Sequence, residues 1–213
     1  GRVKADNSQD IYLTEKTMRT ILASNIDELY IKCAKELVYR PDSILTVRGN
    51  RVCMEIRNAI LELRNPRSRI ITLDARKMSL KYFVGELCFY LAGSDDVDFI
   101  SYYSKFWKKI SDDGKTVRSA YGKRLFYDVV SNTTQINYVI DCLKHDRSSR
   151  KAVAAIYDSH IDSRTSADNP CTMYLDFMIR GTKLLLTTHM RSNDIWLGTP
   201  YDIGFFTLVQ EIV

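Results

Sequence analysis

The sequence predicts a single α/β domain that spans residues 1–213. Segments with helical periodicity are interspersed with short strand-like segments, and neither an internal repeat nor a linker separates them. A chain of 213 residues is long enough to bury a large core within one domain. We expect the polar segment Gly1–Asp10 to be flexible.

In the first third of the chain, the apolar spacing predicts helices over Leu13–Ala23 and Ile26–Val38. Ser43–Arg51 indicates the end of a strand and a turn that carries Arg48. Arg69–Leu73 predicts a short strand, because turn-forming residues directly precede it.

Ser79–Leu91 has the clearest helical pattern, since its apolar residues form one stripe and Gly93 follows its end. Aromatic residues make the other face apolar too, so we expect burial nearly all round. Glu86 lies in the middle of this helix. A buried carboxylate must be paired or serve chemistry, because burial disfavours its charged form. A structural ion pair or a partly exposed face is the alternative for Glu86.

The remaining elements follow from the same periodicities. Helices are predicted over Phe99–Ile110, over Thr133–Leu143 and from about Tyr201 onwards, the last introduced by Gly198–Pro200. The β-branched segment Ala152–Tyr157 predicts a strand.

Two alternating segments, Cys171–Ile179 and Leu184–Met190, predict a β-hairpin. Such a hairpin holds the Cys171 thiol and the Arg191 guanidinium on one wall. A thiolate beside fixed positive charge is a nucleophile paired with an anion site. The alternative is a buried strand cysteine and an unrelated surface arginine.

Composition narrows the class of protein. A net charge of +5 without a dense Lys/Arg block suits anionic metabolites such as nucleotides better than nucleic acid. The five cysteines are scattered and lack CxxC spacing, which argues against a disulfide framework or a zinc site and favours a reducing compartment. With no signal-peptide pattern and no apolar run of membrane-spanning length, we expect a soluble cytoplasmic protein without a metal.

Several features follow one another in a fixed order. They are Arg48, Glu86, Trp107, Tyr121-Gly122-Lys123, Ser149-Arg150-Lys151, Pro170-Cys171, Arg191-Ser192-Asn193-Asp194 and Leu197-Gly198-Thr199-Pro200-Tyr201-Asp202. From about residue 45 to the end, this ordered set resembles the thymidylate synthase family. Within the family it is most similar to the phage-type cytidylate hydroxymethylases. Thr172 after the cysteine, Met190 before the arginine, and Asp202 support that branch.

The resemblance implies an α/β (α+β) fold of three layers, in which helices pack on a large twisted mixed or antiparallel sheet. It also implies a homodimer formed through that sheet. Family members continue well past the helix near Tyr201, so we expect the C-terminal part of the family fold to be missing from this chain.

The resemblance further implies the chemistry. Cys171 would attack C6 of a pyrimidine nucleotide monophosphate, and C5 would take a one-carbon unit from 5,10-methylene-tetrahydrofolate. Water addition completes a hydroxymethylase reaction, whereas hydride from the folate completes a synthase reaction. Glu86 would relay protons through ordered water, and Tyr121 would assist removal of the C5 proton.

By the same resemblance, Arg48, Arg191 and Ser192 would bind the phosphate of the nucleotide. Arg150 and Lys151 would reach across the dimer to the partner's phosphate site. A solvated basic turn is the alternative for that pair.

For the folate, the resemblance implies that Trp107 stacks on the ring and Asp194 hydrogen-bonds to the pterin. Leu197 and Gly198 would belong to the same cofactor site. A tryptophan of the core is the alternative for Trp107.

Asp202 bears on the choice of base. An ionised carboxylate has no proton to give to O4 of uracil, but it can accept from the N4 amino group of cytosine. A proton shared with N3 completes a two-point contact, so we predict a cytidylate substrate. The alternative is that Asp202 caps the final helix.

We therefore predict a folate-dependent 5-hydroxymethyltransferase that acts on dCMP or CMP. One alternative is a thymidylate synthase that methylates dUMP, and another is a catalytically idle family member that binds nucleotide or RNA. The sequence is compatible with either sugar, and with phage DNA modification as well as nucleoside-antibiotic synthesis.

Overall fold

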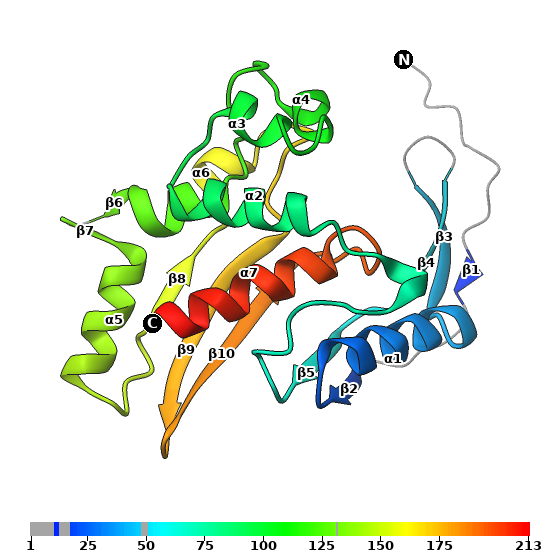
Figure 1. Cartoon of the computed structure of the whole chain (residues 1–213), viewed down its shortest axis with the longest axis horizontal. Coiled ribbons are helices and arrows are strands. Elements are labelled where there is room, and N and C mark those ends of the chain that lie inside the picture. Colours follow the sequence, from blue (N-terminus) through cyan, green and yellow to red (C-terminus); the bar gives the residue numbers. More distant parts are fainter. Residues whose placement is uncertain (1–10, 13–17, 48–50, 131) are drawn as a thin grey trace. The chain divides into compact units, whose positions relative to one another are not determined.

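The computed structural model describes residues 11–12, 18–47, 51–130 and 132–213. The chain divides into two compact units, of which the first ends at Arg76 and the second begins at Lys77. Figure 1 labels the helices and strands of both units.

In the first unit, helix α1 (Ile26–Tyr39) begins at a side-chain cap. The Asn25 side chain accepts the Glu28 N–H at 2.9 Å and so satisfies one of the free donors of the first turn. Ile26, Leu29 and Cys33 are buried at helical spacing, as the sequence predicted.

The strands of this unit form two small sheets. β1 (Ile11–Tyr12), β3 (Ser43–Val47) and β4 (Arg51–Glu55) pair antiparallel in the order β1-β3-β4. β2 (Arg19–Ala23) pairs parallel with β5 (Ala59–Leu63), and the 3-10 turn η1 (Asp74–Arg76) ends the unit.

The helix predicted over Leu13–Ala23 is wrong for its described part, because Arg19–Ala23 is strand β2. Its residues alternate between buried and more exposed positions, and the buried Arg19 guanidinium forms an ion pair with Asp42. Pairing with β5 and this ion pair come from residues distant in sequence, so the local spacing could not reveal them.

The strand predicted over Arg69–Leu73 is also wrong. The backbone N–H of Thr72, which a strand would use in a ladder, donates instead to Asp27 Oδ1 at 2.9 Å. The predicted turn with Arg48 lies outside the described residues.

The second unit is larger and carries most of the helices. They are α2 (Leu80–Leu91), α3 (Val97–Ser101), α4 (Phe106–Ile110), the π-helical turn η2 (Lys123–Tyr127), α5 (Gln135–His145), α6 (Ser159–Asp162) and α7 (Thr199–Ile212). The helix predicted over Phe99–Ile110 is thus interrupted between α3 and α4. The interruption lets the Tyr103 ring lie against Gly85 of α2.

The predicted hairpin is confirmed as β9 (Thr172–Arg180) and β10 (Lys183–Met190). The predicted strand before it is β8 (Val153–Ala155), which pairs with β9, so the sheet order is β10-β9-β8 with antiparallel neighbours. The short strands β6 (Val129–Val130) and β7 (Thr133–Thr134) pair separately.

A register shift interrupts the β9–β10 ladder near its open end. His189 pairs with Tyr174, but Met190 pairs with Thr172, so Met173 is an extra residue on β9. The Met173 carbonyl instead accepts the backbone N–H groups of Ile156 and Tyr157, at 2.8 and 3.0 Å.

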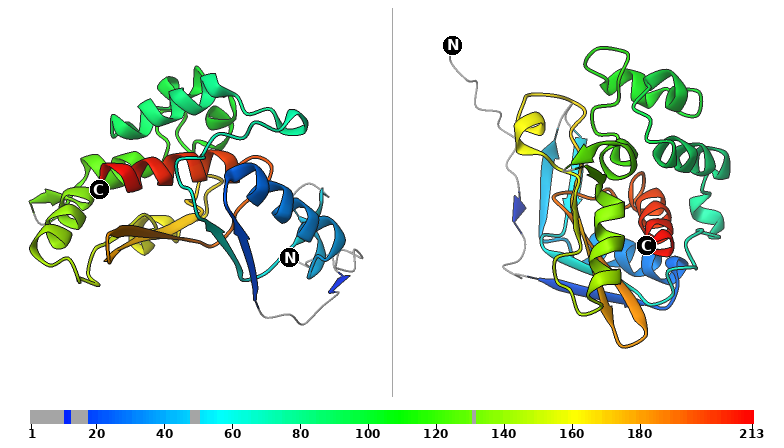
Figure 2. Two further views of the ribbon diagram at one scale, coloured as in Figure 1. Left: turned by 60° about the horizontal axis from the view of Figure 1, so that its bottom comes forward. Right: turned by 90° about the vertical axis from the view of Figure 1, so that its left-hand side faces the viewer.

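This unit is built in layers. In Figure 1 and in both views of Figure 2, α7 lies between the β9–β10 hairpin and α2. A buried apolar cluster fills the layers and includes Phe89, Ile100, Leu125, Val139, Phe177 and Phe205. The α7 helix therefore contacts both the sheet and the helix that carries Glu86.

Gly122 permits a close approach of two segments in this core. A Cβ on Gly122 would lie 2.0 Å from the carbonyl oxygen of Tyr90, a backbone atom of α2. Only a glycine lets the backbone at residue 122 approach the α2 backbone this closely. Its neighbour Tyr121 is thereby placed against α2.

We expect Gly122→Ala to lower the free energy of unfolding by about 3 kcal/mol, because the added methyl group meets backbone that must move. Urea unfolding would measure the loss. Gly114→Ala is a suitable control, since a Cβ there meets nothing within 4 Å and the positive φ of +69° alone costs about 1 kcal/mol. Equal losses in the two variants would show that Gly122 relieves no clash.

Candidate active site

The open end of the β9–β10 hairpin brings Cys171 and Arg191 together, as the sequence predicted. The backbone N–H of Arg191 donates to the Cys171 carbonyl at 2.8 Å. The guanidinium donates through Nε to the Pro170 carbonyl at 3.0 Å and through Nη2 to the Asn169 carbonyl at 3.1 Å. Arg191 therefore holds the segment that carries the thiol.

The Cys171 side chain is half-buried, and burial raises the pKa of its thiol. The Arg191 charge opposes that shift, while the carboxylates of Asp202, Asp168 and Asp194 add to it. The lowering of the thiol pKa by the Arg191 charge is therefore outweighed by burial. In the free protein the thiol form is favoured at neutral pH.

Tyr121 is buried beside this end of the sheet. Its ring is stacked with Tyr90 at 5.6 Å and with Phe206 at 6.0 Å between ring centroids. Burial and the Asp202 charge raise the pKa of the Tyr121 hydroxyl well above its ordinary value. The Cys171 and Asp202 charges both act on Tyr121, so the three side chains share one region.

Glu86 is buried in α2, with 7% of its surface exposed. Its Oε1 accepts a hydrogen bond of 2.6 Å from the Tyr82 hydroxyl. Burial raises the pKa of Glu86 to about 8, the hydrogen bond from Tyr82 lowers it, and the Asp202 charge raises it. Glu86 forms no ion pair with a described cation. Its raised pKa therefore favours the neutral acid at pH 7.

Asp202 lies in the first turn of α7, where it was predicted, but it does not cap the helix. Its Oδ2 accepts a hydrogen bond of 3.0 Å from Asn193 Nδ2. Burial raises the pKa of this carboxyl to about 7, against the effect of that hydrogen bond. The Thr199 hydroxyl donates to Asn193 Oδ1, which fixes the amide with its donor towards Asp202. Sequence reasoning missed this role of Asn193.

Asp194 organises the turn that leads into α7. Its Oδ1 accepts the backbone N–H groups of Trp196 at 2.8 Å and Leu197 at 2.6 Å, and its carbonyl accepts the N–H of Gly198 at 3.0 Å. The side chains of Trp196 and Leu197 are 54% and 64% exposed. Both apolar side chains are therefore exposed next to the Asp194 carboxylate.

Trp107, on α4, is half-buried, and its Nε1–H donates to the Tyr82 hydroxyl at 3.1 Å. This bond uses only the edge of the indole, and it is compatible with a ligand stacked on the ring face.

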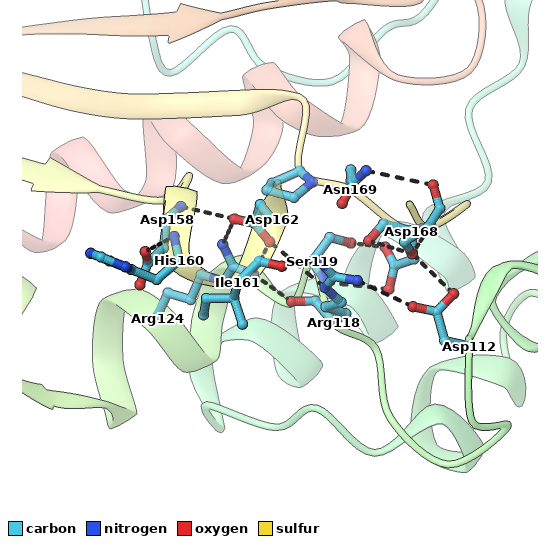
Figure 3. A network of polar contacts seen from close by, with 12 residues as sticks. Asp112, Arg118, Ser119, Arg124, Asp158, His160, Ile161, Asp162, Asp168 and Asn169 are labelled. Atoms are coloured by element: carbon cyan, nitrogen blue, oxygen red, sulfur yellow. Dashed lines mark hydrogen bonds and ion pairs between the residues drawn. The ribbon is translucent and has the colours of Figure 1, made fainter. Parts of the chain in front are cut away.

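A polar network supports the segments before Cys171 and Tyr121, and Figure 3 shows it. The buried Asp168 carboxylate accepts the backbone N–H of Ser119 at 3.2 Å and the Ser119 hydroxyl. Arg124 binds Asp162 through two hydrogen bonds of 2.5 and 2.9 Å. Sequence reasoning missed this network, because its members are 38 to 49 residues apart.

The predicted phosphate residues are not all gathered at Cys171. Ser192 is exposed beside Arg191, and Arg48 lies outside the described residues. Arg150 lines a cavity of about 540 Å³ near the closed end of the hairpin, together with Arg147 and Arg180. Cys171 and Ile179, which lines that cavity too, are separated by about 26 Å of extended chain. Lys151 is exposed next to Arg150.

Two further properties concern the described residues as a whole. No three of their His, Cys, Asp or Glu side chains gather in a way that could hold a metal ion. None of the described helices is long and apolar enough to cross a membrane.

The fold and this site define an α/β protein in which the half-buried Cys171 lies close to Asp202, and Asp202 in turn lies close to the buried Glu86. Residues 30–213 match the model of the thymidylate synthase family. The chain belongs to that family.

Two phage proteins are among its relatives. The deoxyuridylate hydroxymethyltransferase of Bacillus phage SP01 is 33% identical over 192 residues, which cover 85% of this chain and 50% of that protein. The enzyme of the same name from Delftia phage PhiW-14 is 28% identical over 174 residues, or 74% of this chain and 46% of that protein. The chain thus spans about half the length of these relatives.

The fold is also that of a solved family member. The thermostable thymidylate synthase A of Bacillus subtilis superposes with a TM-score of 0.63 at 18% identity, covering 89% of this chain and 72% of that one. This likeness confirms the predicted α/β fold.

The raised thiol pKa predicts slow alkylation of Cys171 by iodoacetamide at pH 7, with a rate that increases above pH 8 as the thiolate forms. Arg191→Met removes the charge that lowers this pKa, so we expect alkylation several-fold slower at pH 8. Peptide mass spectrometry would separate Cys171 from the exposed Cys53 and Cys88. Arg180→Met is the control, and a wild-type rate in Arg191→Met would contradict the electrostatic role.

Proposed function

We propose that the chain is a folate-dependent 5-hydroxymethyltransferase that acts on a cytidylate, dCMP or CMP. The observation that carries the proposal is the gathering of a thiol, two carboxyls of raised pKa and a tyrosine around one end of the sheet. The names of the phage relatives support the hydroxymethyl product.

In this proposal Cys171 is the nucleophile. Its sulfur forms a bond to C6 of the pyrimidine, and the electron pair of the C5–C6 double bond makes C5 a carbon nucleophile. After C5 has gained its substituent and lost its proton, the bond from sulfur to C6 breaks and the double bond returns. The backbone contacts from Arg191 hold Cys171 in place during both steps.

Glu86 is the proposed acid, because it is neutral at pH 7 and can donate its proton. Tyr121 is proposed to assist removal of the C5 proton. Its raised pKa keeps it protonated, so it would orient a water or a base rather than ionise itself.

The turn before α7 fits the folate. Asp194 offers a carboxylate for the pterin, the exposed Leu197 with its neighbour Gly198 offers a contact surface, and Trp107 offers an aromatic ring. When bound, 5,10-methylene-tetrahydrofolate supplies the one-carbon unit. The role of this surface is to place that unit next to C5.

Asp202 favours cytosine through the position of its proton. Asn193 donates to Oδ2, so the proton of the neutral acid lies on Oδ1. Facing cytosine, Oδ1–H meets the basic ring nitrogen N3 and Oδ2 accepts from the N4 amino group. The proton can move to N3 and leave a charge-assisted pair. Uracil in the same position turns its N3–H towards this proton and its O4 towards the acceptor Oδ2, so both contacts are mismatched.

The phosphate is proposed to bind Arg191 and Ser192 from its own chain. Arg150 lies near Ile179 at the closed end of the hairpin, and about 26 Å of extended chain separates Ile179 from Cys171. Arg150 is therefore too far away to reach this phosphate. We therefore propose a homodimer through the sheet, in which Arg150 and Lys151 approach the partner's phosphate. In this assembly residues 1–213 act as one domain, since the family match crosses both compact units. The free cysteines favour the cytoplasm.

A second candidate substrate is dUMP, because the phage relatives are named for deoxyuridylate. If its proton instead lay on the oxygen that faces O4, a neutral Asp202 would donate to O4 and accept from N3–H, so its pKa of about 7 permits this substrate near neutral pH. A thymidylate synthase reaction on dUMP is the corresponding alternative within the family.

The first test incubates the purified protein with methylene-tetrahydrofolate and, separately, dCMP, CMP, dUMP and UMP. We expect mass spectrometry to find a hydroxymethylated cytidylate. We expect Cys171→Ser to lose at least about a thousand-fold in turnover while its nucleotide affinity, from calorimetry, stays within a few-fold.

The other outcomes are equally informative. Turnover by Cys171→Ser at the wild-type rate would exclude the covalent mechanism. Nucleotide binding without any product would favour an idle binding protein, although such a protein has no need for Cys171, Glu86 and Arg191 together.

Replacing Asp202 tests the base. In Asp202→Asn the Asn193 amide still needs an acceptor at the Oδ2 position, so the new NH2 group takes the Oδ1 position. This donor cannot transfer a proton to N3. We expect the ratio of kcat/KM for dCMP to that for dUMP to fall about ten-fold or more, equivalent to about 1.4 kcal/mol. A competition assay with equal concentrations measures it, with the exposed Asp141→Asn as control. An unchanged ratio would remove Asp202 from base recognition.

A further inference from the structure

Trp107, Tyr82 and Glu86 are linked by two successive hydrogen bonds, and the series ends at the Glu86 carboxyl. Trp107 Nε1–H donates to the Tyr82 hydroxyl at 3.1 Å, and that hydroxyl donates to Glu86 Oε1 at 2.6 Å. Tyr82 and Glu86 are four residues apart on α2, so they lie on one face of the helix. Trp107 reaches them from α4.

The direction of this series is fixed by chemistry. An indole nitrogen can only donate, so the Tyr82 oxygen must be the acceptor of that bond. The single proton of Tyr82 is then directed at Glu86, and Oε1 must accept it. In neutral Glu86 the proton is therefore left on Oε2, since the bond from Tyr82 to Oε1 is the one hydrogen bond of this carboxyl among the described residues.

We propose that Tyr82 is a positioning residue for Glu86, and that Trp107 acts through Tyr82 to determine which Glu86 oxygen carries the proton. The inference rests on the proposed function for the claim that this proton is used in catalysis. The claim about the proton's position is independent of that function.

The surroundings leave Tyr82 little freedom. Its ring meets Tyr201 of α7 edge to face, with 4.8 Å between centroids and 84° between planes. The Tyr201 hydroxyl in turn accepts the backbone N–H of Ser79, the N-cap of α2, at 3.2 Å. Tyr82 is thus held by α2, α4 and α7 together, and Tyr201 directly precedes Asp202.

Electrostatics agree with this geometry. The titratable groups that face Glu86 are Tyr82 and Tyr90 on α2 and Asp202 on α7. The hydrogen bond from Tyr82 is the one contribution among them that lowers the pKa of Glu86. The hydrogen bond from Trp107 lowers the pKa of Tyr82, which makes Tyr82 a better donor.

The test follows the Glu86 carboxyl directly by infrared difference titration of the full chain, with Glu86→Gln subtracted to isolate its signal. We expect a midpoint near pH 8 in the wild type. Tyr82→Phe removes a donor to the charged form, so the midpoint should rise by about one to two pH units. Trp107→Phe should raise it less.

The double variant gives the sharpest outcome. If Trp107 acts through Tyr82, adding Trp107→Phe to Tyr82→Phe moves the midpoint no further. Tyr102→Phe, which alters a hydroxyl on a residue that is 72% exposed, is the control and should titrate as the wild type. An unchanged midpoint in Tyr82→Phe, or the same Trp107→Phe shift in both backgrounds, would overturn the inference.

Activity supplies a separate readout. We expect the decline of kcat at high pH to move up in Tyr82→Phe by the same interval as the infrared midpoint, with kcat at pH 7 about ten-fold lower and the nucleotide KM unchanged. A larger KM with an unmoved pH profile would indicate a structural role and count against the proposal. If the wild type forms no product, the proposed function fails, while the infrared titration still tests the series of hydrogen bonds.

Discussion

The register of the β9–β10 ladder is the constraint on which the site depends. Side chains alternate across a strand, so only one register places Cys171 and Arg191 beside each other at the open end. The ladder runs from the turn at Arg180 to the bond between Arg191 N–H and the Cys171 carbonyl. The Arg191 guanidinium also donates to the carbonyls of Pro170 and Asn169, which directly precede Cys171. The same residue therefore ends the ladder and places a positive charge next to Cys171.

Helix α7 lies between this hairpin and helix α2, which carries Glu86. One of its faces contacts β10, and another contacts α2. Asp202 lies in its first turn, close enough for its charge to act on Cys171, Tyr121 and Glu86. Because burial raises the pKa of both carboxyls, the site holds protons near pH 7 that exposed carboxyls would have lost. The charge of Asp202 on α7 therefore adds to the effect that burial has on these three groups.

Much of this arrangement could be predicted from the sequence. The hairpin, a helix over the segment around Glu86 and the position of Asp202 at a helix start all follow from local periodicity. The expected burial of that helix nearly all round is wrong, because Leu80, Val84 and Leu91 are 43 to 56% exposed and only the face with Glu86 is buried. The strand at Arg19–Ala23 did not, because a parallel partner and a buried ion pair override local spacing. Asn193 was also missed. Its function depends on which way its amide points, and Thr199 fixes that only in the folded chain.

The extra residue Met173 also bears on where the hairpin can tolerate insertions and deletions. At this point β9 carries one residue more than β10, and the ladder is locally interrupted. Loss or gain of a residue between Cys171 and Leu175 would turn the Cys171 side chain to the opposite face of the sheet, whatever it did to stability. At the other end, Gly181 lies in an open turn where an added side chain meets nothing within 4 Å. Length variation in this hairpin should therefore be confined to the turn.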